Sequence, residues 1–330
     1  MSDVAEYINA RFRRHLLFGL CPVGRFMSFT GTPLSFHSFG GYTMKIHRKS
    51  GKSLFLALGF IGLGMASTAH AGTPVYLSGN GNDSNPCNLQ QPCRLLPAAL
   101  AAVTSGGEVV MLDSADYNTG EVTISQNVTI LAVPGAVGGI LVDYNSAGGV
   151  AINIASGPTV TLRNLHFHQS ETILGASSFF VGVLAGSAVL NIFASDFEGV
   201  DTGVLANAGA NVSVSQSTFR GGKTGISFDG TSTSFVQGVI DQSTVVSNSN
   251  AGIYAIYANI AVSHSNLSNN YCAVGPSTKG LVRLDNDIIS GNHYGIYYGS
   301  STQVQTTGSN NFFNNYVDMY GGVLTTVSTK

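Results

Sequence analysis

The chain contains no tryptophan and little charge, since Asp, Glu, Lys and Arg make up 10 % of its 330 residues. A disordered chain carries more charge and fewer apolar residues than one that is 44 % hydrophobic, so disorder is excluded as the main state. Proline numbers nine and the 41 glycines keep no three-residue period, which excludes a collagen helix. Glu, Lys and Leu are too scarce for a long coiled coil. What is left is an all-β chain rich in glycine, serine and asparagine.

Residues 44–71 have the pattern of a secretory signal peptide. A basic stretch follows Met44, an apolar run of 13 residues ends at Ala66, and Ala69-His70-Ala71 is a small-x-small cleavage site. The run is short for a membrane span, which takes about 20 residues. We therefore expect an exported protein, periplasmic or extracellular, with no membrane span in the mature chain.

The segment that follows this signal is acidic. Residues 72–330 hold seven basic and fifteen acidic residues, a net charge of −8, against −2 for the whole chain. Nucleic acid needs phosphate-neutralising Lys and Arg, so we expect no nucleic-acid partner. We interpret residues 1–43, in front of the signal, as an over-extended start or an unstructured leader.

Three of the four cysteines follow the cleavage site. Cys87 and Cys93 enclose five residues in an exported chain, which predicts a disulfide; the alternative, a metal site, has no histidine nearby. Such a short loop mainly fixes the N-terminal segment. Cys272 is left over, and we expect a buried free thiol there.

Internal periodicity is the most informative feature of the chain. An apolar anchor residue recurs at spacings of 30, 22, 26, 22, 22 and 23. The anchors are Phe167, Phe197, Phe219, Val245, Leu267, Ile289 and Phe312. Apolar residues five and seven positions before most anchors alternate as in a strand. A further apolar residue stands seven or eight positions after most anchors, and a glycine usually precedes it. Each unit of about 22 residues therefore predicts two or three short strands and no helix.

A unit of this kind is one coil of a single-stranded parallel β-helix, whose backbone groups bond to coils about 4.8 Å above and below. Asparagines three residues after the anchor form a column that can hydrogen-bond from coil to coil, a structural role. They are Asn248, Asn270, Asn292 and Asn315. Leucine-rich and hexapeptide repeats do not fit the spacing. We expect the β-helix over residues 108–330 and an N-terminal cap over 72–107, with a short helix from Arg94 to Val103 covering the open end.

The start of the predicted cap carries a family resemblance. The string Tyr76-Leu77-Ser78-Gly79-Asn80-Gly81-Asn82-Asp83, followed by Cys87, Pro92-Cys93 and the predicted helix, resembles the start of bacterial exported proteins of the pectin-lyase-like superfamily. The resemblance covers nearly all of the mature chain and implies a right-handed parallel β-helix. The superfamily includes lyases, hydrolases, epimerases and adhesins, so the resemblance implies no single activity. The strings typical of polygalacturonase-like hydrolases (Asn-Thr-Asp, Asp-Asp, Gly-His-Gly, Arg-Ile-Lys) are absent, and so is a compact aspartate cluster of the pectate-lyase kind.

Polar residues on the predicted outward faces supply one candidate catalytic set. Asp241 and Asp285 fall two coils apart, about 10 Å between backbones, which is loosely compatible with a pair of inverting carboxylates. His264 falls on the coil between them, and Arg283 on the same face as Asp285. The plainer interpretation, which we favour, is that all four are solvated residues on an exposed strand face.

Two further groups of residues are candidate ion sites. Asp196, Glu198 and Asp201 surround one turn, where Ca²⁺ is the one cofactor that we consider; the alternative is a solvated turn. His166 and His168 flank an anchor, but a metal site there needs a third ligand that the sequence does not identify. We therefore predict no metal site.

Tyrosines eight or nine positions after the anchor are the strongest functional feature, at Tyr254, Tyr297 and Tyr320. Aromatic rings with a polar tip are common at binding surfaces, although tyrosine also simply suits strands. We therefore expect a non-catalytic protein that binds an extracellular polysaccharide along one flat face. The alternatives are a carbohydrate-active enzyme that uses the aspartates and His264, and a surface adhesin or scaffold. The C-terminal coil shows no cap, so we expect a partner subunit, in a homo-oligomer, or the chain's own tail to cover it.

Overall fold

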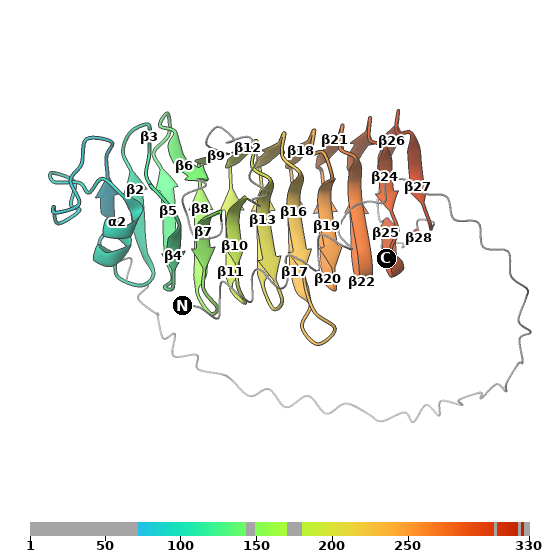
Figure 1. Cartoon of the computed structure of the whole chain (residues 1–330), viewed down its shortest axis with the longest axis horizontal. Helices are drawn as coiled ribbons and strands as arrows, with labels where there is room; N and C mark the ends of the chain where they lie inside the picture. The colour runs from blue at the N-terminus through green and yellow to red at the C-terminus, as the bar shows by residue number, and fades with distance from the viewer. Residues whose placement is uncertain (1–71, 143–148, 170–179, 307–308, 323–324, 327–330) are drawn as a thin grey trace, which may run out of the picture. The chain divides into compact units, whose positions relative to one another are not determined.

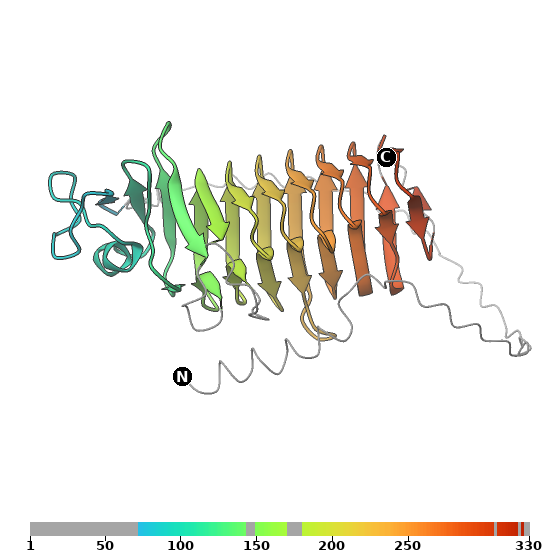
Figure 2. The same cartoon turned by 45° about the horizontal axis from the view of Figure 1, so that its top comes forward.

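The computed structural model describes residues 72–142, 149–169, 180–306, 309–322 and 325–326. The predicted signal and the segment in front of it lie outside these ranges. The described residues form one helix and 28 strands, which wind into stacked coils (Figures 1 and 2). No helix within these ranges has the length and apolarity to cross a bilayer.

Each coil adds a strand to three parallel sheets, so the predicted parallel β-helix is confirmed. Sheet 1 contains β1 (Val75–Leu77), β2 (Gly107–Met111), β5 (Val128–Ala132), β8 (Thr159–Arg163), β11 (Val189–Phe193), β14 (Asn211–Ser215), β17 (Val236–Asp241), β20 (Ala258–Ser263), β22 (Cys272–Asp285), β25 (Ser300–Thr306) and β28 (Thr325–Thr326). Sheet 2 contains β4 (Val122–Ile124), β7 (Val150–Ile154), β10 (Val181–Ala185), β13 (Thr202–Asn207), β16 (Thr224–Asp229), β19 (Ala251–Ile256), the first part of β22, β24 (Tyr294–Tyr297) and β27 (Val317–Tyr320). Sheet 3 contains β3 (Ala115–Asp116), β6 (Gly138–Val142), β9 (Leu165–Gln169), β12 (Asp196–Glu198), β15 (Thr218–Arg220), β18 (Thr244–Val246), β21 (Asn266–Ser268), β23 (Ile288–Ser290) and β26 (Asn311–Phe313).

The anchor column is the central row of sheet 3. Phe167, Phe197 and Phe219 pair in register, and their rings stack with centroids 4.3 and 4.5 Å apart. The later anchors are buried aliphatic residues, except Phe312, which is partly buried in the last complete coil. Inward residues of sheets 1 and 2 complete one continuous apolar core. The spacing of the anchors in the sequence is therefore the pairing register of the strands.

Glycines before the inward residue of sheet 2 make room for the anchor rings. A Cβ at Gly203 would lie 2.6 Å from Cδ1 of Phe219 and 2.7 Å from the carbonyl oxygen of Gly225. We therefore expect Gly203→Ala to lower the free energy of unfolding by about 1–3 kcal/mol through overpacking, measured by urea denaturation. Gly120→Ala is the matched control, because nothing lies within 4 Å of its added Cβ. Equal stability of the two variants would contradict this packing argument.

The turn from sheet 1 into sheet 3 repeats the same backbone conformation. A non-glycine residue with φ between 48° and 55° stands there in coil after coil. These residues are Asn164, Ala194, Gln216, Gln242, His264 and Asn286. The next position forms a column of buried serines whose hydroxyl oxygens accept the N–H of the coil before. Asp287 takes the serine position in the last of these turns.

The asparagine column lies on the opposite side of sheet 3. The backbone N–H and Nδ2 of Asn248 both donate to Oδ1 of Asn270, at 3.0 and 2.9 Å. Asn270 and Asn292 make the same pair of bonds to Asn292 and Asn315. The column thus pairs polar groups between coils, in the interior rather than at a ligand surface.

The N-terminal cap contains the helix and a disulfide loop. Helix α2 (Leu96–Ala102) buries Leu96 and Ala99, and Cys87 is bonded to Cys93 as predicted. Asp113 accepts hydrogen bonds from Ser78, Gly79 and Tyr117. Burial alone would raise the pKa of Asp113, but these hydrogen bonds outweigh it and hold the pKa below its ordinary value.

The prediction for Cys272 was wrong. Its side chain is buried as expected, but it is disulfide-bonded and not a free thiol. The prediction counted only the cysteines after residue 71, and that count left Cys272 alone.

Candidate functional site

A groove of about 340 Å³ runs over the outward face of sheet 1. The register places three columns of outward residues on this face, and the central one forms the floor of the groove. The floor consists of Ser213, Val239 and Ala261, with Asn191 at one end and Arg283 at the other. Beside it stands a row of amides, Asn211, Gln237 and Asn259, one from each of three successive coils.

The side-chain amides of this row are unengaged. Those of Asn211, Gln237 and Asn259 make no hydrogen bond with any other described residue. A primary amide has two N–H donors and an acceptor oxygen, so each coil presents a donor and an acceptor to whatever lies in the groove. Arg283 is the one charged side chain among the described residues that line it.

The predicted carboxylates occupy the third outward column of sheet 1. Asp241, Ser263 and Asp285 pair in register on successive coils. Oδ1 of Asp241 accepts a hydrogen bond from the Ser263 hydroxyl at 2.8 Å and lies 3.2 Å from Nδ1 of His264. Asp241 and His264 are thus brought together, with Asp285 one coil beyond Ser263.

The other two members of the predicted set have different surroundings. His264 is 56 % exposed and occupies the turn position that holds Gln216 and Gln242 in the coils before. Arg283 lines one end of the groove, and its Nε donates to the side chain of Gln305 on the next coil at 3.4 Å. Of the predicted set only Arg283 lines the groove, and the four side chains do not converge on one point.

The predicted tyrosines lie on the outward face of sheet 2, where two of them stack and Tyr254 pairs in register with Gly275 of the next coil. Tyr297 and Tyr320 stack with centroids 5.1 Å apart and planes 13° apart. Tyr254 is only 9 % exposed, because it packs with Ala251 and Cys272. A sugar ring packs on an open aromatic face, whereas coils about 4.8 Å apart let neighbouring rings cover one another. Only Tyr320, at 48 % exposure, presents much surface.

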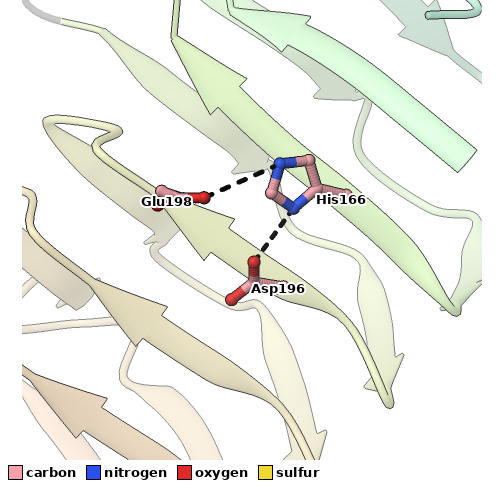
Figure 3. A group of neighbouring side chains, drawn as sticks. All are labelled: His166, Asp196 and Glu198. Carbon is pink, nitrogen blue, oxygen red and sulfur yellow. Dashed lines mark hydrogen bonds and ion pairs between the residues drawn. The ribbon is translucent and has the colours of Figure 1, made fainter. Parts of the chain in front are cut away.

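A second hollow, of about 450 Å³, lies on the outward face of sheet 3. Strands β9 and β12 pair so that His166 faces Asp196 and His168 faces Glu198. Nδ1 of His166 lies 2.9 Å from Oδ2 of Asp196, and its Nε2 lies 3.9 Å from Oε2 of Glu198 (Figure 3). Nε2 of His168 lies 2.8 Å from Oδ1 of Asp116.

The acidic group predicted around one turn is divided by the structure. Arg220, on β15, donates from one Nη to Asp196 at 3.0 Å and to Glu198 at 2.9 Å. Asp201 instead pairs with Lys223 at 2.8 Å. Sequence reasoning treated the histidines and the carboxylates as unrelated groups. The shared register of the Phe167 and Phe197 anchors was the signal that could have joined them.

Comparisons with known proteins identify the handedness of the coil. Residues 202–329 match a family model described as a right handed beta helix region. No curated protein matches the chain.

Two solved structures share the fold at low sequence identity. The GH136 lacto-N-biosidase from Eubacterium ramulus has a TM-score of 0.54 and is 14 % identical in sequence. The match covers 71 % of this chain and only 56 % of the lacto-N-biosidase chain. The pectate lyase Pel9A has a TM-score of 0.50 at 15 % identity, covering 74 % of this chain and 78 % of that one. At such identities the likeness shows the fold alone.

Proposed function

We propose, for a chain with the right-handed parallel β-helix of the pectin-lyase-like proteins, that it binds an extracellular polysaccharide along the groove of sheet 1 without cleaving it. The observation that carries the proposal is the row of unengaged amides at Asn211, Gln237 and Asn259. Sugar hydroxyls donate and accept hydrogen bonds, as primary amides do. Because the row repeats at the coil spacing of about 4.8 Å, an extended polymer along the stack meets the same groups at each coil.

Charge favours a neutral polymer. Residues 72–330 carry a net charge of −8, which repels polyanions at long range. The groove itself offers a single cation, Arg283. Export, which the signal-like segment 44–71 predicts, is part of this proposal.

The non-catalytic part of the proposal rests on the placement of the aspartates. An inverting pair has carboxyl groups about 6.5–9.5 Å apart with room for a water between them. Asp285 stands two coils from Asp241, about 10 Å between backbones, which is only loosely compatible with this separation. The proposal rests on Asp241, whose carboxylate already accepts a hydrogen bond from Ser263 and contacts His264.

Each of two alternative functions is favoured by one specific observation. The contact of Asp241 with His264 beside a groove favours a carbohydrate-active enzyme. Exposed apolar side chains in the last coils, among them Phe313 and Tyr316, favour a scaffold in which two copies associate through their C-terminal coils.

Replacing Gln237 and Asn259 together by Ala should weaken retention on a bound polysaccharide at least about fivefold. Each lost hydrogen bond contributes about 0.5–1.5 kcal/mol, and about 1.4 kcal/mol corresponds to tenfold. Affinity gel electrophoresis in neutral polysaccharides measures the retention. Asn311→Ala, which removes an exposed amide from the outer face of sheet 3, is the control and should leave retention unchanged. Equal retention of the two proteins would refute the groove as the binding surface.

A second pair of substitutions separates binding from catalysis. Asp241→Asn with Asp285→Asn should leave retention within about twofold, because neither carboxylate lines the groove. Loss of a measurable polymer-cleaving activity in this variant would favour the enzyme alternative.

A further inference from the structure

The polar hollow on sheet 3 holds an imidazole between two carboxylates, and this is unrelated to the groove of sheet 1. One ligand atom from each of His166, Asp196 and Glu198 lies within 4.8 Å of the other two (Figure 3). All three project outward from the adjacent strands β9 and β12, so rigid pairing of the two strands fixes their spacing.

The two nitrogens of His166 have different partners. Nδ1 lies 2.9 Å from Oδ2 of Asp196, a distance at which a carboxylate favours the neutral tautomer that donates from Nδ1 and has its lone pair on Nε2. Nε2 faces Oε2 of Glu198 at 3.9 Å, which is too long for a hydrogen bond. A metal ion with bonds of about 2.0–2.2 Å to a histidine nitrogen and a carboxylate oxygen fits between two such atoms.

The cluster has more carboxylates than basic side chains, which favours the binding of a cation. Asp116, Asp196 and Glu198 supply three carboxylates. Among the described residues, Arg220 donates to the carboxylates of Asp196 and Glu198, and Arg94 donates to the main-chain oxygen of Asp116 at 2.6 Å. Arg220 approaches Asp196 and Glu198 from the next coil, on the side away from His166, and orients both. While His166 is neutral, the single charge of Arg220 balances only one of the two carboxylates that it contacts, Asp196 and Glu198.

The hollow leaves space for an ion and its further ligands. Gly139 stands between Asp116 and His166 in the register, and a Cβ there would collide with Oδ1 of Asp116. His168 stacks on His166 with ring centroids 5.4 Å apart and lines the same hollow. Coordination positions not taken by the protein would therefore face a space of about 450 Å³ that admits water or an oxygen of a ligand.

We propose that His166 and Glu198 bind a divalent transition metal of the Zn²⁺ type, with Asp196 as the carboxylate that positions the histidine. A nitrogen ligand with a carboxylate oxygen suits Zn²⁺, Co²⁺ or Ni²⁺, whereas Ca²⁺ takes oxygen ligands. A carboxylate on the second nitrogen of a metal-binding histidine is the common arrangement in such sites.

Isothermal titration of the untagged protein with ZnCl₂ tests the proposal. We expect one equivalent to bind, and His166→Ala or Glu198→Gln to weaken binding at least tenfold. Asp196→Asn should weaken it about tenfold, because it no longer fixes the imidazole. His264→Gln is the matched control: His264 also contacts an aspartate, but through a single nitrogen, and glutamine already occupies this turn position in two other coils. Binding by His166→Ala equal to that of the parent, or no binding by the parent, would overturn the proposal.

Arg220→Gln is expected to change the affinity for Zn²⁺ in the opposite direction. Removing a guanidinium that lies 3.0 Å or less from both carboxylates should strengthen Zn²⁺ binding several-fold. A cluster that is only a salt bridge predicts no gain. If His166→Ala does not fold, as judged by circular dichroism, Glu198→Gln and Arg220→Gln decide the outcome.

Discussion

Phe197→Ala is expected to lower the free energy of unfolding by about 3–5 kcal/mol, the largest loss that we predict. Phe197 is the middle ring of the anchor stack, buried between Phe167 and Phe219 at centroid distances of 4.3 and 4.5 Å. The neighbouring rings cannot close the cavity, because backbone hydrogen bonds between β9, β12 and β15 fix the coil spacing.

Urea denaturation followed by circular dichroism measures the loss. Phe313→Ala is the matched control, since Phe313 stands in the last coil of sheet 3 at 43 % exposure. We expect it to lose less than about 1 kcal/mol. Similar losses of unfolding free energy in the two variants would show that the stacked rings do not stabilise the core.

Asp287→Ser is expected to make the protein more stable at pH 8 than the parent, with a difference that disappears towards pH 4. Asp287 is 1 % exposed in the serine column. Its carboxylate accepts the N–H of Ser265 at 2.9 Å and that of Asp285 at 3.1 Å. Burial nevertheless raises its pKa to about 7 from its ordinary value of 3.8.

The sign follows from proton binding. Between pH 3.8 and about 7 the folded protein keeps a proton on Asp287 that the unfolded chain releases, so stability falls as the pH rises through this window. Above it, both states are ionised and the cost is constant. A serine accepts the same N–H with no charge, as Ser265 does for Ser243.

The measurement is the free energy of unfolding of both proteins in urea at several pH values. The difference between variant and parent should grow by about 3–4 kcal/mol from pH 4 to pH 8, since one unit of pKa corresponds to about 1.4 kcal/mol. Parallel pH profiles would contradict the raised pKa of Asp287.

The register of the coils could be predicted because every coil of a β-helix meets the same surroundings. The spacing from Phe167 to Phe197 and Phe219 equals the observed strand pairing for that reason. Likewise, the asparagine spacing marks positions that bond from one coil to the next. In a repeat protein the residues that make the same contact recur in the sequence once per coil.

Features that belong to a single place in the fold were harder to predict. His166 and Glu198 lie in different coils, and each coil alone offers too few ligands to suggest a site. Tyr254 takes an outward position, but it is 9 % exposed and packs with Ala251 and Cys272, a contact that the period of the repeat does not encode. The groove of sheet 1 likewise arises from small side chains at Ser213 and Ala261, which carry no chemical motif.

The most direct test of polysaccharide binding is incubation of the purified protein with a panel of neutral and acidic polysaccharides, with and without Ca²⁺. Retention on each polymer and release of shorter chains are followed in the same samples. We predict retention on a neutral polysaccharide, no shortening of any polymer, and weakened retention when Gln237 and Asn259 are replaced. Shortening of any polymer, or no retention across the panel, would contradict a non-catalytic polysaccharide-binding protein.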